Sequence, residues 1–157
     1  MGSFGASLDR DANRATVTSN EAFKASSDWT FSASTTGAVS SHTVFTVTGD
    51  VLVQVVGICK SNLTSGGAAT ISMGTAADVE NLIALTTAVD IDLGEVWQNA
   101  TPTPDVGAAL TAPGPVSSGA DIVIDILSAT ITGGQLVFYC LWRPLSSDGN
   151  VVAATPA

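Results

Sequence analysis

Two apolar segments constrain the fold of this chain most strongly: residues 50–60 (DVLVQVVGICK) and residues 135–145 (QLVFYCLWRPL). Both are rich in β-branched or aromatic residues, which favour strands. Both carry apolar side chains at odd and at even positions, as in a strand that is covered on both faces. Gly57 interrupts the first segment and indicates a bulge or a close backbone approach. The two segments therefore predict central β-strands with more apolar surface than one core needs.

Shorter strands and turns surround these segments. Large apolar side chains alternate with small polar ones in Trp29–Ala33, and the alternation continues through Val39–Val47. This is the period of a half-buried strand. Residues 121–131 and 135–145 flank Thr132-Gly133-Gly134, whose glycines permit the positive φ of a tight turn. We therefore expect these last two segments to form a central hairpin.

One segment has helical character. Thr75 can cap a helix over Thr75–Leu85, and Val79, Leu82 and Ile83 then lie on one helical face. A strand remains the alternative reading of this segment. With at most one helix among about eight short strands and many Pro/Gly-rich connections, the sequence predicts a mostly-β protein, an antiparallel β-sandwich or jelly roll.

The two ends differ from the centre. Residues 1–28 show neither a strand nor a helix period, so we expect an extended N-terminal arm before a β-sandwich domain at 29–145 and a small-residue tail at 146–157. Such an arm suits strand addition along another subunit, with Phe4 and Phe23 as anchors. The sequence therefore predicts that the arm contacts a partner.

The charge pattern excludes some partners. Only 12% of the residues are charged, and the formal net charge is −9. Acids and bases balance in residues 1–25, whereas the rest of the chain opposes its acids only with Lys60 and Arg143. Binding to nucleic acid or to an anionic membrane needs clustered cations, so we expect neither partner.

Cellular location follows from the absence of an apolar signal-like stretch at the start and of an apolar run long enough to span a bilayer. We expect synthesis in the cytosol, where cysteines are reduced. Cys59 and Cys140 both lie in apolar strands. Buried free thiols are therefore favoured over a disulfide.

Catalytic and metal-binding patterns are weak. His42 is the single histidine, and it lies in a Ser/Thr-rich strand without a nucleophile motif. The acids at 90, 92 and 95, and the pair at 121 and 125, are typical of solvated strand faces rather than of a glycosidase. Incidental calcium binding at residues 90–95 stays an alternative, although the EF-hand spacing is missing. We expect no catalytic residues, no cofactor and no resident metal.

The tryptophans divide into core and surface. Trp142 shares a strand face with Leu136, Phe138 and Cys140, which predicts a core position. Trp97 precedes a proline- and glycine-rich segment at 99–120, and long loops often carry binding. We therefore expect Trp97 to be an exposed anchor for a protein partner or a sugar.

The C-terminal residues 121–126 (DIVIDI) and 131–146 (ITGGQLVFYCLWRPLS) resemble the closing hairpin of small virion proteins of tailed bacteriophages, of the head-decoration or fibre type. Residues 74–79, 85–88 and 93–97 are similar to the middle segment of these proteins, and the resemblance covers about residues 50–150. It implies a β-rich fold, self-association, often as trimers, and attachment to a capsid or tail lattice. It implies no catalytic residues.

Together these observations predict a non-enzymatic virion structural protein, assembled in the host cytoplasm, that decorates or cements a phage capsid. Its expected partners are copies of itself, as a trimer first and a dimer second, and other virion proteins such as a capsid protein. The alternative is a glycan- or receptor-binding module of a fibre or tail that uses Trp97 and residues 99–120.

Overall fold

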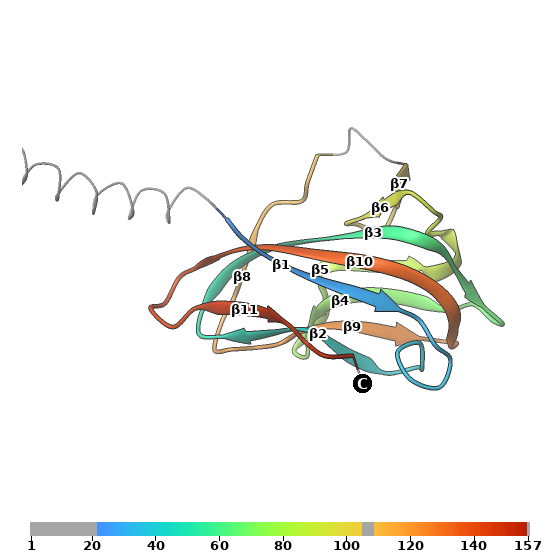
Figure 1. Ribbon diagram of the computed structural model, residues 1–157, viewed down its shortest axis with the longest axis horizontal. Helices are drawn as coiled ribbons and strands as arrows, with labels where there is room; N and C mark the ends of the chain where they lie inside the picture. The colour runs from blue at the N-terminus through green and yellow to red at the C-terminus, as the bar shows by residue number, and fades with distance from the viewer. Residues whose placement is uncertain (1–21, 105–108, 157) are drawn as a thin grey trace, which may run out of the picture.

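Two antiparallel sheets pack face to face in the computed structural model, which describes residues 22–104 and 109–156 (Figure 1). Sheet A has the strand order β1-β10-β3-β6-β7, with β8 also paired to β3, and sheet B has the order β11-β2-β9-β4-β5. The elements are β1 Phe23–Thr30, β2 Ser41–Thr48, β3 Val51–Ser65, β4 Thr70–Thr75, β5 Asp78–Thr87, a 3-10 turn η1 Ala88–Asp90, β6 Glu95–Trp97, β7 Thr103–Pro104, β8 Gly114–Val116, β9 Ile122–Leu127, β10 Ile131–Pro144 and β11 Asn150–Ala153. The predicted antiparallel β-sandwich is confirmed.

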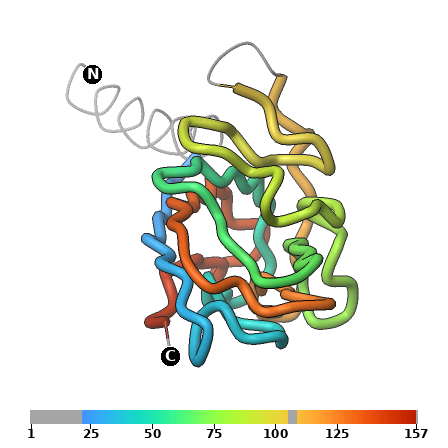
Figure 2. The backbone as a smooth tube through the Cα atoms, turned by 90° about the vertical axis from the view of Figure 1, so that its right-hand side faces the viewer, coloured from blue at the N-terminus to red at the C-terminus, as the bar shows by residue number. Residues whose placement is uncertain are grey.

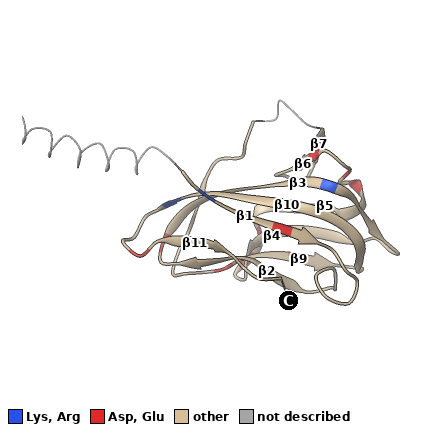
Figure 3. Ribbon diagram, in the orientation of Figure 1, with Lys and Arg blue, Asp and Glu red and all other residues tan. Residues whose placement is uncertain are grey.

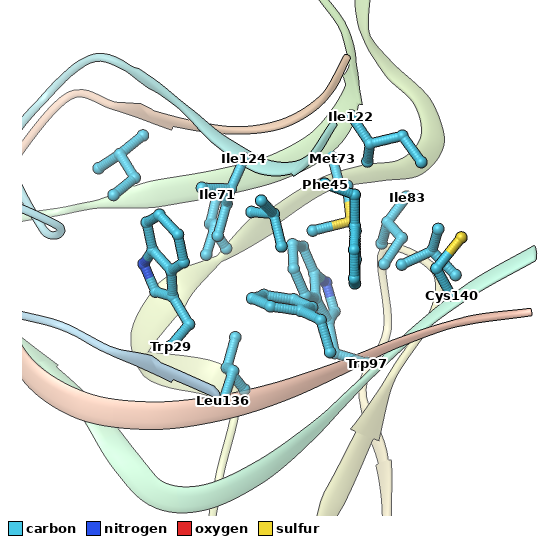
Figure 4. Packing of buried hydrophobic residues seen from close by; sticks show 14 of the residues in the cluster. Trp29, Phe45, Ile71, Met73, Ile83, Trp97, Ile122, Ile124, Leu136 and Cys140 are labelled. Atoms are coloured by element: carbon cyan, nitrogen blue, oxygen red, sulfur yellow. The ribbon is translucent and has the colours of Figure 1, made fainter. Parts of the chain in front are cut away.

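The hydrophobic core lies between the two sheets (Figure 4). Trp29 and Phe138 project into it from sheet A, and Phe45 and Ile124 project from sheet B; all four are buried. Burying side chains of this size contributes about 1.5–3 kcal/mol each. Trp142 also belongs to the core, as predicted. In the described part of the chain, no helix is both long and apolar enough to cross a membrane.

The central strands of sheet A are β3 and β10, as predicted for two-faced apolar segments. Gly57 of β3 lies opposite Phe138 of β10. A Cβ atom at residue 57 would lie 3.1 Å from the Phe138 ring and 3.4 Å from the Trp97 ring. The predicted close approach at Gly57 is confirmed, because glycine lets two aromatic rings pack directly against the strand backbone.

The predicted hairpin of residues 121–131 and 135–145 is wrong. β9 pairs with β2 and β4 in sheet B, whereas β10 pairs with β1 and β3 in sheet A. Residues 128–130 therefore cross from one sheet to the other, and Ser128 takes a φ of 68° in this connection. Gly133 and Gly134 lie inside β10 where its register with β3 shifts. Both strands carry one fully apolar face, so they face each other across the core instead of pairing edge to edge.

The predicted helix at Thr75–Leu85 is also wrong, since residues 78–87 form β5. Ile71 pairs with Thr86 and Met73 pairs with Ile83, so two residues along β4 correspond to three along β5. Ile83 and Thr86 are consequently both buried, three positions apart. A register irregularity of this kind produces a spacing that imitates one helical turn.

Both chain ends contribute strands to the sheets. β1 begins at Phe23, inside the segment predicted as an arm, and pairs along its whole length with β10. β11 lies in the predicted tail and pairs with β2. Figure 2 shows the same arrangement after a turn of 90°. Phe4 and the rest of the predicted arm up to residue 21 lie outside the described residues.

Candidate assembly surface

Sheet A has a second apolar face, which points away from the core. Along β3, Val51, Val53 and Val55 are buried in the core, while the residues between them point to the opposite side and are half-exposed. The same alternation holds along β10, where Leu136, Phe138 and Cys140 face the core. We call the six apolar side chains on the opposite side the outer face of sheet A: Leu52, Val56 and Ile58 of β3, and Val137, Tyr139 and Leu141 of β10.

Strand register brings these six side chains into one continuous patch. Val56 pairs with Tyr139, and Ile58 pairs with Val137 in the next row. Neighbouring strands lie about 4.8 Å apart, so such side chains touch across the strands. Val137 is buried although it lies outside the core cluster. The sequence-based expectation of excess apolar surface in both segments corresponds to this patch.

Cations border the outer face. The basic residues in the described part of the chain are Lys24 of β1, Lys60 of β3 and Arg143 of β10, and all three are exposed (Figure 3). The Lys24 Nζ atom lies 5.8 Å from the centre of the Tyr139 ring. Asp28 of β1 pairs with Val137 and adds one acid. Lys24 and Arg143 lie at one end of the face and Lys60 lies toward the other end of β3. Sequence reasoning missed this arrangement because the three cations share a face only through the β1-β10-β3 pairing.

Two glutamines hold one border of the outer face. The Gln98 side chain donates to the Ala109 carbonyl oxygen at 3.1 Å and accepts from the Thr111 amide at 3.2 Å. The Gln54 side chain donates to the Thr111 carbonyl oxygen. The described residues 109–113 are thereby tied to β3 at the side of sheet A where β6 and β7 stand (Figures 1 and 2). In the sequence, this border was indicated only by the two polar residues Gln54 and Gln98, which lie in or next to apolar strand segments.

A shallow hollow of about 170 Å³ opens at one end of the outer face. Its lining residues come from four parts of the chain: Ala22, Leu52, Gln54, Pro113, Leu141, Trp142 and Arg143. Phe23 packs against its pair partner Trp142 on the core-facing side of sheet A with ring centres 4.8 Å apart, and 46% of Phe23 stays exposed. Phe23 is thus accessible, as a partner-binding anchor requires, and its contact with a partner stays a prediction.

The predicted exposure of Trp97 is wrong, because its side chain is fully buried. The indole Nε1 donates to the Thr86 hydroxyl at 2.8 Å, and the ring packs edge-on against Phe138 at 6.2 Å. Its partner on β3 is Gly57, which leaves room for the ring. Position before a proline-rich loop was a poor guide, since pairing of β6 with β3 turns this side chain inward.

The residues considered for catalysis have structural partners. The His42 Nε2 atom lies 2.9 Å from the Ala38 carbonyl oxygen and 3.0 Å from the Ser40 hydroxyl, so the ring has local polar partners. Asp121 accepts from the Val47 amide at 3.0 Å, and Asp125 accepts from the Ser41 hydroxyl. Over the described ranges, no group of three or more His, Cys, Asp or Glu side chains is placed to hold a metal.

Both cysteines are buried free thiols, as predicted. Burial raises the pKa of Cys140 to about 12 and also raises the pKa of Cys59. A thiol with a raised pKa is a poor nucleophile at neutral pH. Neither thiol is therefore placed to act as a nucleophile.

Comparison with known proteins gives structural neighbours. No protein-family model matches the chain, and no curated protein matches it. A chain of the acidic stable capsid structure of Helicobacter pylori bacteriophage KHP30 aligns with a TM-score of 0.53 and 13% identity over 87% of this chain and 94% of its own length. A chain of the capsid asymmetric unit of cyanophage Pam1 aligns with a TM-score of 0.51 and 16% identity over 80% and 88%. The protein thus shares its fold with chains found in two phage capsids.

Proposed function

We propose that this protein is a non-enzymatic virion structural protein that decorates or cements a phage capsid. The observation that carries the proposal is the outer face of sheet A, an apolar patch on the central strands that the core does not use. Monomeric proteins rarely leave large contiguous apolar patches exposed, and such patches often mark protein interfaces. The fold shared with chains of two phage capsids supports a place on the virion.

The partners are copies of this chain and another virion protein such as a capsid protein. A closed homo-oligomer, a trimer in the first instance, follows the general preference for cyclic symmetry. Assembly takes place in the host cytoplasm, and the N-terminal arm joins the protein to the particle. The glycan-binding alternative has lost its anchor, because the Trp97 ring is buried and cannot stack on a sugar.

Particle binding tests the proposal. Capsids prepared from a phage that lacks this gene are mixed with the purified full chain and pelleted through sucrose. We expect the full chain to pellet with the capsids and a variant without residues 1–21 to stay in the supernatant. The deletion ends at residue 21 because β1 begins at Phe23. Circular dichroism of the variant checks its fold, and full-chain protein that never pellets with capsids contradicts the proposal.

A further inference from the structure

We propose that the outer face of sheet A is the docking site for residues 1–21 of a neighbouring copy of this chain. The inference rests on the proposed function, since it names the contact by which copies join. It concerns a surface of the sandwich rather than the arm alone. Four observations lead to it: the place where the arm leaves, its length, its composition and the charge of the face.

The arm leaves the sandwich beside this face. Ala22, the first described residue, lines the hollow together with Leu52, Leu141 and Pro113. Strand β1 then runs along β10 from Phe23, which pairs with Trp142, to Thr30, which pairs with Gln135. The described chain therefore begins at one end of the outer face, and residues 1–21 precede this point. A neighbour placed there can receive them.

Length and composition suit an extended ligand for a sheet face. Twenty-one extended residues span at most about 70 Å, which is enough to cross another sandwich of this size. Residues 6–22 contain neither glycine nor proline, the strongest turn signals, so a reversal onto their own face is disfavoured. Phe4, Leu8 and Val17 are spread among small residues, and their spacing follows neither a helix period nor a strand period that would gather them on one face of the arm. An apolar face on another copy can bury them.

The charges of the two candidate occupants of the outer face, the arm and a second outer face, favour the arm. Packing two outer faces against each other would bring Lys24 and Lys60 of one copy toward the same cations of its partner. Like charges brought together at an interface are unfavourable. The arm instead offers Asp9, Asp11 and Glu21 alongside Arg10 and Arg14, so it brings carboxylates to the face as well as cations. The arm therefore brings three carboxylates toward the cations of the face, whereas a second outer face brings one, Asp28.

Cysteine cross-linking between two full-length variants tests this docking. One variant carries S7C in the arm and a size tag, and the other carries V56C at the centre of the outer face. They are mixed at micromolar concentration and treated briefly with a short bismaleimide. The native Cys59 and Cys140 are buried and add little background. The matched control is T46C, an exposed position on β2 in sheet B.

We expect the S7C–V56C heterodimer to form at least about tenfold faster than the S7C–T46C heterodimer, because docking raises the effective concentration of the two thiols. Equal rates overturn the inference. Predominant V56C–V56C homodimers overturn it in favour of face-to-face packing, and intrachain cross-linking of an S7C/V56C double variant overturns it in favour of the chain's own arm. Capsid binding without the heterodimer leaves the proposed function standing alone, whereas the heterodimer without capsid binding leaves only the docking.

Discussion

The inner and outer faces of sheet A are built from the same two strands, β3 and β10, but they differ in what they pack against. On the inner face, Phe138 and Leu136 meet sheet B and are fully buried. On the outer face, their neighbours Tyr139 and Val137 meet no second sheet among the described residues; Lys24 lies near the Tyr139 ring, and Asp28 is the β1 partner of Val137. One set of strands thus provides one face of the core and a second apolar face, which we propose to be a contact surface.

This difference shows how a chain with few charged residues can fold as a sandwich and still carry a second apolar face outside its core. A strand that is apolar on both faces is normally found in the middle of a multilayered protein. Here residues 22–104 and 109–156 provide no third layer over the outer face, and we infer that a partner supplies it. Substitutions on the inner face should therefore change stability, whereas substitutions on the outer face should change association.

The largest expected effect is on the inner face. Phe138→Ala should lower the free energy of unfolding by about 3–5 kcal/mol, because it leaves a cavity in the centre of the core. Tyr139→Ala, the next residue but on the outer face, should cost less than about 1 kcal/mol. Urea denaturation followed by circular dichroism measures both. Equal losses for the two variants would break the distinction between the faces.

The next effect concerns the close packing at Gly57. Gly57→Ala introduces a Cβ atom at 3.1 Å from the Phe138 ring and 3.4 Å from the Trp97 ring. Overpacking of this kind costs about 1–3 kcal/mol. Gly66→Ala is the matched control, since an added Cβ there meets no atom within 4 Å. Thermal unfolding compares the two, and a stable Gly57→Ala protein would show that the rings can move away.

A smaller effect should appear in alkaline solution. Burial raises the pKa of Cys140 from 9.0 to about 12, so between these two values the unfolded chain loses the thiol proton while the folded chain keeps it. The free energy of unfolding should fall with rising pH in this window, by up to about 1.4 kcal/mol per pH unit from this thiol. Well below pH 9 the effect is absent, because the thiol keeps its proton in both states.

Cys140→Ala removes this contribution and should flatten the decline between pH 9 and 10.5 relative to the wild-type protein. All other side chains are the same in both proteins, so the comparison of slopes isolates the thiol. Urea denaturation at several pH values gives the slopes. Identical slopes would mean that Cys140 is accessible to solvent, against its burial in the core.

Sequence patterns predicted the strands of the sandwich well where apolar and polar side chains alternate and where apolar residues form a long continuous segment. Residues 50–60 were recognisable as a central strand, and the excess apolar surface of both long segments was visible before the fold was known. The pairing of strands was not, because β9 and β10 are adjacent in sequence and equally apolar, and nothing local says that they lie in different sheets. The same limit explains Trp97 and β5, whose orientation depends on partners that are distant in the chain or shifted in register.

The mass of the full chain in solution tests the role of the outer face most directly. Sedimentation velocity at micromolar concentration compares the wild-type protein with a Val56→Asp/Leu141→Asp variant and with Thr46→Asp on sheet B as the matched control. We expect the wild-type and control proteins to sediment as oligomers and the outer-face variant to sediment near the chain mass of 15.8 kDa, with an unchanged circular dichroism spectrum. A wild-type protein that sediments as a monomer, or an outer-face variant that keeps the wild-type mass, would contradict the account.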